Sequence, residues 1–141
     1  MEGRNPTQMS KLRLLLADDH EDLLREITAL VEREFEVIGV AHNGNALVEA
    51  AAELSPDVVI TDFKMPGLSG IDATRKLLSQ GTCKAVVLLS NYADNQLVDR
   101  AFEAGIQGFV LKVKAGEDLI PAIRSAFQGV AFVSSFHASS V

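Results

Sequence analysis

Carboxylate, hydroxyl and ammonium side chains stand directly after short apolar runs at four places in this sequence. Asp18 and Asp19 follow Leu14–Ala17, Asp62 follows Val58–Thr61, Ser90 follows Ala85–Leu89, and Lys112 follows Gly108–Leu111. Apolar or β-branched runs of this length are typical of buried strands in a parallel sheet. Because open α/β sheets bind ligands at the carboxyl ends of their strands, we expect these side chains to share one cleft.

Three carboxylates in one cleft need a compensating charge. Two unit charges about 4 Å apart repel by about 4 kcal/mol at an effective dielectric constant near 20. An open, oxygen-lined cleft suits Mg²⁺, which proteins usually hold with one or two carboxylates plus phosphate and water. The ion would also neutralise an incoming phosphoryl group, so that a carboxylate could attack it and form an aspartyl phosphate. We therefore predict a phosphoryl-transfer site, in which Lys112 supplies positive charge and Ser90 a hydroxyl.

Each of these residues also has an ordinary structural explanation. The acid pair alone would suit the positive end of a helix dipole, Ser90 alone a turn, and Lys112 alone a solvated loop. Their joint occurrence at four strand ends favours the phosphoryl site. His20 and His42 have no partner at metal-ligand spacing, and we interpret both as surface histidines.

Helical stripes alternate with the apolar runs along the chain. The predicted order is strand Arg13–Ala17, helix Leu23–Val31, strand Phe35–Ala41, helix Ala46–Leu54, strand Val58–Asp62, helix Ile71–Leu78, strand Lys84–Ser90, helix Leu97–Phe102, strand Gly108–Leu111 and helix Gly116–Gln128. Pro121 is expected to kink that last helix or to delay its start. The pattern predicts an α/β fold: a doubly wound (βα)₅, flavodoxin-like three-layer sandwich with a parallel five-stranded sheet of order 2-1-3-4-5.

Length and composition fit one folded domain. The chain has 141 residues, a net charge of −6 and 48% hydrophobic residues. The acidic balance disfavours a nucleic-acid surface, and no apolar run approaches the roughly 20 residues of a membrane span. A single cysteine, Cys83, allows no internal disulfide, which favours a reducing cytoplasm. Residues 1–11 are expected to be a disordered lead-in, and the apolar tail after residue 129 to pack partly on the domain.

Three segments resemble the receiver domain of bacterial two-component response regulators, in particular the NarL/LuxR-type subgroup. They are Leu15–His20, Asp62–Gly70 and Ala104–Lys112, and the resemblance spans residues 12–129. It implies a signalling domain rather than an enzyme. At most, such a domain phosphorylates itself from a small donor and slowly loses the phosphoryl group. Asp62 would accept the phosphoryl group from the phosphohistidine of a sensor histidine kinase.

The resemblance also implies how the site and its switch are built. Mg²⁺ would be bound by Asp19, Asp62 and the backbone carbonyl of Lys64, with Asp18 in support. Ser90 and Phe109 would form a switch pair that changes the surface of the fourth helix, fifth strand and fifth helix. Tyr92 is bulky for its place and is expected to shield the phosphoryl group. Asn91 stands where the family mostly has a small or apolar residue, and both departures bear on the lifetime of the phosphoryl group. Val113 replaces a frequent proline, so the Lys112–Val113 bond is expected to be trans.

The output and two alternatives stay open. The subgroup usually carries a C-terminal helix-turn-helix domain that binds DNA, so residues 130–141 are expected to be a tail or the start of a linker to such a domain. Whether the chain forms a homodimer is left open by the sequence. A receiver-like fold could instead serve unphosphorylated as a dimerisation or docking module. An Asp-based phosphatase of the haloacid-dehalogenase type would need a second acid two residues after the nucleophile, where this chain has Lys64.

Overall fold

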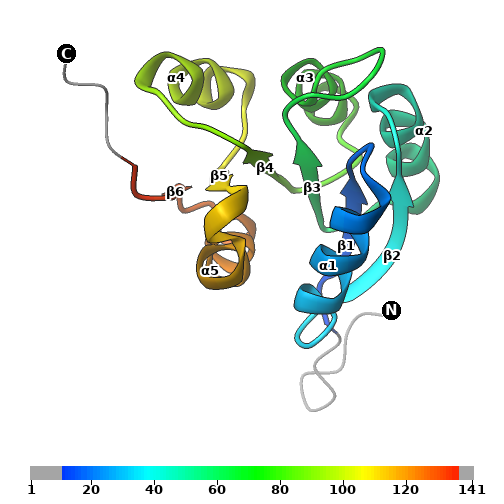
Figure 1. The fold of residues 1–141 in the computed structure, drawn as a ribbon. Coiled ribbons are helices and arrows are strands. Elements are labelled where there is room, and N and C mark those ends of the chain that lie inside the picture. Colours follow the sequence, from blue (N-terminus) through cyan, green and yellow to red (C-terminus); the bar gives the residue numbers. More distant parts are fainter. Residues whose placement is uncertain (1–10, 137–141) are drawn as a thin grey trace.

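A parallel six-stranded sheet forms the centre of the computed structural model, which describes residues 11–136 (Figure 1). The strands are β1 Arg13–Ala17, β2 Glu36–Ala41, β3 Val58–Asp62, β4 Ala85–Ser90, β5 Gly108–Leu111 and β6 Phe132–Val133. The helices are α1 Glu21–Val31, α2 Gly44–Leu54, α3 Gly70–Gln80, α4 Asn95–Ala104 and α5 Ala115–Phe127, with a 3₁₀ turn η1 over Lys112–Lys114. The strand order β2-β1-β3-β4-β5-β6 confirms the predicted doubly wound topology and extends it by one strand.

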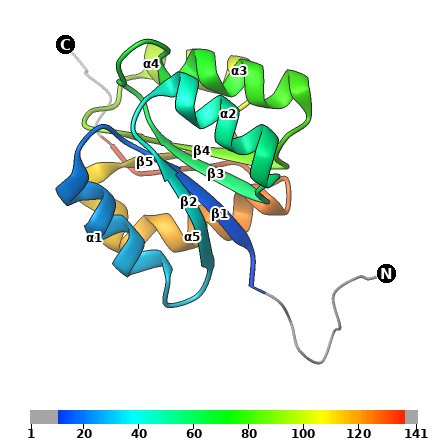
Figure 2. The same ribbon diagram turned by 90° about the vertical axis from the view of Figure 1, so that its right-hand side faces the viewer.

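Helices cover both faces of this sheet. Helices α1 and α5 lie on one face, and α2, α3 and α4 lie on the other (Figure 2). Side chains alternate between the two faces along each strand. Leu14 and Leu16 therefore join the hydrophobic core under α1 and α5, while Leu15 and Ala17 join the core under α2, α3 and α4. Every residue of β3, β4 and β5 is buried, as expected of a parallel sheet covered on both sides.

Helix α5 begins earlier in the sequence than expected from the position of Pro121. It begins at Ala115 and continues through Pro121, so the expectation of a late start is wrong. A proline leaves the carbonyl four residues earlier without its usual helical partner. That carbonyl belongs to Glu117, and both Pro121 and Glu117 are exposed, which allows water to replace the missing bond.

The sixth strand was not expected from the sequence. Gly129 adopts a left-handed backbone conformation, with φ of 82°, and turns the chain back from the end of α5. Phe132 and Val133 then pair in parallel with Gly108 and Phe109. Residues 132–135 of the tail therefore pack on the domain. The expected lead-in falls almost entirely on residues 1–10, which lie outside the described residues. Within residues 11–136, no helix is long and apolar enough to cross a membrane.

Candidate functional site

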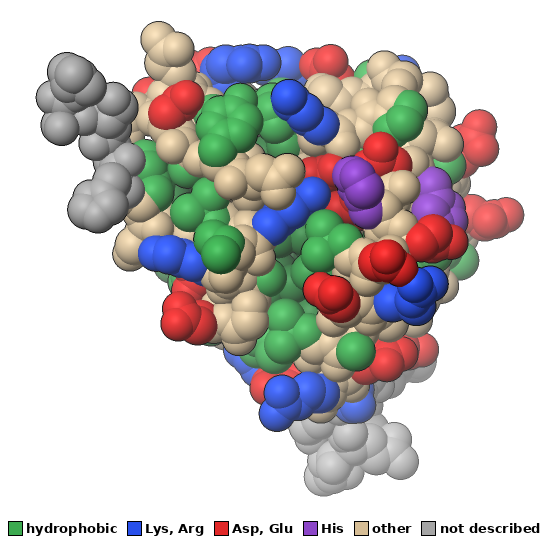
Figure 3. Space-filling view, in the orientation of Figure 1, with side chains coloured by type: hydrophobic (Ala, Val, Ile, Leu, Met, Phe, Trp, Pro, Cys, Tyr) green, Lys and Arg blue, Asp and Glu red, His purple; other side chains and the backbone are tan. Residues whose placement is uncertain are grey.

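The carboxyl ends of β1, β3, β4 and β5 bring the predicted site residues together. Asp18 follows β1, Asp62 and Ser90 are the last residues of β3 and β4, and Lys112 begins η1 directly after β5. One pocket at this edge is lined by Asp19, His20, Asp62, Phe63, Lys64, Ser90, Asn91, Tyr92 and Lys112. Figure 3 shows acidic side chains gathered around the histidines on the visible face. The proposed convergence of carboxylates, hydroxyl and ammonium is thus present.

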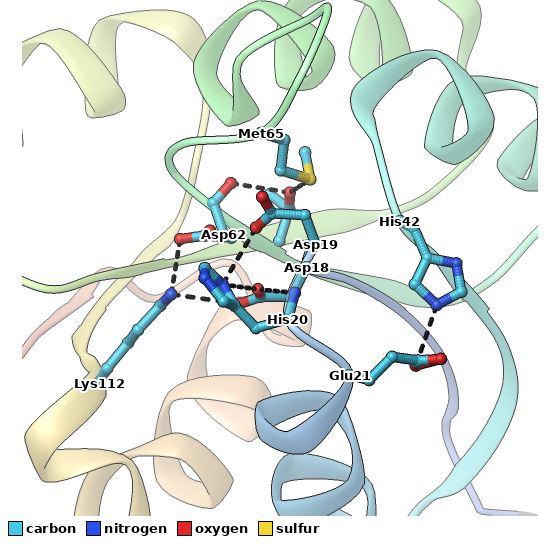
Figure 4. A network of polar contacts seen from close by, with 9 residues as sticks. Asp18, Asp19, His20, Glu21, His42, Asp62, Met65 and Lys112 are labelled. Carbon is cyan, nitrogen blue, oxygen red and sulfur yellow. Dashed lines mark hydrogen bonds and ion pairs between the residues drawn. The ribbon is translucent and has the colours of Figure 1, made fainter.

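Lys112 bridges two buried carboxylates (Figure 4). Its Nζ lies 2.9 Å from Asp62 Oδ1 and 3.2 Å from Asp18 Oδ2. Asp62 is only 5% exposed and Asp18 only 2%. Charges removed from water to this degree are strongly destabilising unless they are paired. One ammonium serves both carboxylates, so the two acids together remain one positive charge short of neutrality.

The proton affinities at the site reflect this imbalance. Burial raises the pKa of the Asp62 carboxyl above its ordinary value, and the negative charge of Asp18 raises it further. The hydrogen bonds from Lys112 and from the backbone N–H of Lys64 act in the opposite direction but do not cancel the rise. Burial by itself would lower the pKa of Lys112, yet its contacts with Asp62 and Asp18 leave that pKa raised. Lys112 is therefore held in its charged form, and a second cation near Asp62 would stabilise the ionised carboxylate.

The acidic cluster has the composition of a site for a hard cation. Asp18, Asp19, His20 and Asp62 each offer a ligand atom, and all of these atoms lie within 4.8 Å of one another. Three carboxylates of this kind suit Mg²⁺, which prefers oxygen ligands. Asp19 is the most accessible of the three, with a side chain 35% exposed, whereas those of Asp18 and Asp62 are almost fully covered. The residues present thus fit the predicted ion.

His20 is the site residue that the sequence interpretation missed. Its Nδ1 lies 3.1 Å from an oxygen of Asp18 and 3.1 Å from an oxygen of Asp19, although the imidazole is 70% exposed. Its backbone N–H also donates to Asp18 Oδ1 at 2.9 Å. Its position directly after the acid pair was the available signal. His42 remains a surface histidine, with its Nε2 3.1 Å from the exposed Glu21.

The loop between β3 and α3 holds the Asp62 backbone closely. The N–H of Gly70 donates to the carbonyl of Phe63 at 2.8 Å. A Cβ atom at Gly70 would lie 2.2 Å from the backbone oxygen of Asp62, which is far inside van der Waals contact. Only glycine permits the first turn of α3 to approach this strand end so closely. The backbone of Asp62 is therefore held in place by its close packing against the start of α3.

The two predicted switch residues are both buried. The Ser90 hydroxyl donates to the Tyr92 carbonyl at 2.6 Å and accepts from the Tyr92 N–H at 3.2 Å, so the loop after β4 holds it. The Phe109 ring is fully buried among the residues under α3 and α4. Tyr92 is 49% exposed and lines the same pocket as Asp62, where a shielding residue would have to lie.

The peptide bond between Lys112 and Val113 agrees with its prediction. The described residues contain no cis peptide bond, so this one is trans. Val113 itself is 87% exposed on η1.

Comparisons with known proteins give the family. Residues 14–124 match the model of the response regulator receiver domain. The transcriptional regulatory protein LiaR of Bacillus subtilis is 36% identical over 120 residues, which cover 84% of this chain and 57% of LiaR. The response regulator GacA of Pseudomonas aeruginosa is 34% identical over 125 residues, covering 87% of this chain and 58% of GacA. The chain thus spans little more than half the length of these relatives.

Solved structures agree with the sequence relatives. The signal receiver domain of a NarL response regulator from Mycobacterium tuberculosis superposes with a TM-score of 0.81 at 26% identity, covering 86% of this chain and 99% of that one. A LuxR-family two-component response regulator from Aurantimonas has the same TM-score of 0.81 at 28% identity, covering 87% and 89% of the two chains. By family match, by relatives and by fold alike, this chain belongs to the response regulator receiver domains of two-component systems, in their NarL/LuxR-type subgroup.

Proposed function

We propose that this chain is a phosphorylation-dependent switch, in which Asp62 takes a phosphoryl group from a phosphohistidine of a sensor histidine kinase. The observation that carries the proposal is the shared ammonium of Lys112 between Asp62 and Asp18. A carboxylate oxygen of Asp62 attacks the phosphorus and the phosphorus–nitrogen bond breaks. The electron pair stays on the histidine nitrogen, which gains a proton, and an acyl phosphate forms on Asp62.

The surrounding residues divide the remaining work. Mg²⁺, held by Asp19, Asp62 and the Lys64 carbonyl with Asp18 in support, would supply positive charge toward the phosphoryl oxygens. Lys112 turns its ammonium from the Asp62 carboxylate to a phosphoryl oxygen, a short movement because the two lie in direct contact. Asp18 keeps its own contact with that ammonium and limits where it can go.

The lifetime of the phosphoryl group depends on how water reaches it. Asn91 and Tyr92 line the pocket from the loop after β4. The phenol ring of Tyr92 in this lining restricts the access of water, and hydrolysis of the acyl phosphate is slow as a result. The chain therefore acts as a signal carrier with slow self-dephosphorylation and not as an enzyme with external turnover.

The output follows from the Ser90 hydroxyl. Phosphorylation offers that hydroxyl an oxygen acceptor in place of the Tyr92 carbonyl, and the β4–α4 loop moves with it. Phe109, packed under α4, shifts in response and alters the surface formed by α4, β5 and α5. In the full protein this surface would regulate a helix-turn-helix domain that controls transcription in the cytoplasm, as the transcriptional relatives suggest.

The test is phosphorylation with a small donor. The chain is incubated with acetyl phosphate and Mg²⁺, and its intact mass is measured. Wild type and Asp99→Asn, an exposed aspartate on α4, are expected to gain one phosphoryl group, whereas Asp62→Asn gains none. If wild type stays unmodified at every donor concentration, the proposal fails and the unphosphorylated docking module becomes the better explanation.

A further inference from the structure

The C-terminal segment covers the outer edge of β5. Figure 1 shows β6 beyond β5, at the end of the sheet opposite β2. The N–H of Phe132 donates to the Gln107 carbonyl at 2.9 Å, and the N–H of Ser134 donates to the Phe109 carbonyl at 2.9 Å. Without this segment, these carbonyls would form an open sheet edge. We name residues 130–135 the strap.

Ser134 anchors the strap through a hydroxyl that both accepts and donates a hydrogen bond. This serine is 2% exposed, although it lies near the end of the described chain. Its Oγ accepts from the backbone N–H of Leu111 at 3.1 Å and donates to Asp118 Oδ2 at 2.6 Å. The hydroxyl thus ties the last residue of β5 to the first turn of α5. A buried polar group satisfied in both directions marks a specific contact, unlike the general adhesion of an apolar tail.

The turn η1 connects this anchor to the phosphoryl site. Lys112, at one end of η1, reaches Asp62 and Asp18. Lys114, at the other end, donates from its Nζ to the backbone carbonyl of Ser135 at 2.7 Å. Leu111, which Ser134 binds, immediately precedes Lys112. The strap therefore contacts both ends of the segment 111–114, and the phosphoryl site contacts Lys112 within it.

A second connection runs through β5 itself. Val133 pairs with Phe109, the predicted switch residue, and the Phe109 carbonyl receives the N–H of Ser134. Any shift of the Phe109 backbone changes this bond directly. Movement at either the lysine or the aromatic residue of the switch thus reaches the strap without passing through a helix.

We propose that the strap is a releasable cover, docked on β5 in the unphosphorylated chain and released when Asp62 is phosphorylated. This rests on the proposed function of Asp62. When Lys112 moves to a phosphoryl oxygen, η1 moves with it. The bonds from the Leu111 N–H to Ser134 and from Lys114 to Ser135 then weaken together. Release uncovers the β5 edge, which lies at the centre of the α4-β5-α5 output surface.

Amide exchange tests the release. Hydrogen exchange of the Phe132 and Ser134 amides is followed by NMR in the wild-type chain, with and without Mg²⁺ plus beryllofluoride, a phosphoryl mimic. We expect both amides to exchange at least about five times faster with the mimic, the lower end of typical coupling between two sites. Amides in the middle of β1, far from the strap, serve as the internal reference and should exchange no faster with the mimic, because ligand binding stabilises the folded state.

Coupling is reciprocal, so a loosened strap must strengthen binding of the mimic. Ser134→Asp places a negative charge against Asp118 and drives the strap off, and Ser134→Ala removes both bonds of the hydroxyl. We expect at least about five-fold tighter beryllofluoride binding for Ser134→Asp, with Ser134→Ala between it and wild type. Ser135→Ala is the control, because this exposed residue binds Lys114 only through its backbone carbonyl.

Two failures can be told apart. If the wild-type chain does not bind beryllofluoride, the proposed phosphorylation of Asp62 has failed, and the strap proposal falls with it. If the mimic binds while the exchange of Phe132 and Ser134 stays unchanged, or while Ser134→Asp binds it no more tightly than Ser135→Ala, the strap proposal alone is overturned.

Discussion

The Lys112 ammonium lies 2.9 Å from Asp62 and 3.2 Å from Asp18, so one cation serves two carboxylates that are almost fully buried. This relationship makes the site both reactive and unstable. The repulsion that remains between the acids is relieved by a second cation or by a proton.

Mg²⁺ should stabilise the folded chain through Asp19. Binding to the folded state alone adds about 2.7 kcal/mol of stability at a concentration 100 times the dissociation constant. The midpoint temperature of thermal unfolding of wild type should therefore rise with added Mg²⁺ and fall back when the metal is chelated. Asp19→Asn should lose most of this response, whereas the exposed Asp72→Asn keeps it. Equal responses of the two variants would remove Asp19 from the ligand set.

Asp62→Asn should stabilise the metal-free chain at neutral pH. The pKa of Asp62 is raised above its ordinary value of 3.8 in the folded chain. Its protonated form is therefore favoured by folding. The corresponding stability is fully present below pH 3.8 and is lost as the pH rises through the folded-state pKa. Asparagine imitates the neutral acid, so the variant avoids this loss.

Urea unfolding in the presence of a chelator checks this sign. The free energy of unfolding should be higher for Asp62→Asn than for wild type at pH 7. This difference in the free energy of unfolding should become smaller as the pH is lowered toward 3.8, the ordinary pKa of the Asp62 carboxyl. A variant less stable than wild type at pH 7 would show that the Lys112 contact outweighs burial.

Gly70→Ala should damage both stability and phosphorylation. The added methyl group would lie 2.2 Å from the Asp62 backbone oxygen, and packed backbone cannot move away cheaply. Overpacking of this kind costs about 1–3 kcal/mol. Gly116→Ala is the control, because nothing lies within 4 Å of its added atom. In the first turn of α5 that change should be neutral or stabilising by up to about 1 kcal/mol. Urea unfolding of both variants gives the comparison.

Cys83 should be a poorly reactive thiol whose ionisation opposes folding. Burial raises its pKa from 9.0 to about 11. Below pH 9.0 the thiol is neutral in both states, and between these two values only the unfolded chain ionises. Wild type should therefore lose stability relative to Cys83→Ala over this range, by about 1.4 kcal/mol for each pH unit between the two pKa values at most. Unfolding at pH 8 and pH 11 measures the difference.

Much of the site was predictable because its residues are fixed by strand ends. Parallel strands bring their carboxyl ends to one edge, so Asp18, Asp62 and Lys112 had to meet once the apolar runs were recognised as strands. The position of Phe109 on a buried strand followed from the same pattern. The roles of these residues in phosphoryl transfer and switching remain predictions.

Features that depend on a few local contacts were not predictable. Strand β6 has two residues, too few for a period to emerge, and it exists because Gly129 turns the chain and Ser134 finds two partners. His20 is exposed, and only the geometry of its backbone places Nδ1 against both acids. Pro121 was overvalued as a helix breaker because its exposure could not be seen in the sequence.

The central claim is that Asp62 carries the phosphoryl group, and chemical mapping tests it most directly. The chain is phosphorylated with acetyl phosphate and Mg²⁺ and then reduced with borohydride, which converts an aspartyl phosphate to homoserine. Peptide sequencing by mass spectrometry should find homoserine at position 62 and aspartate at positions 18 and 19. Homoserine at position 18 or 19, with position 62 unchanged, would contradict the assignment.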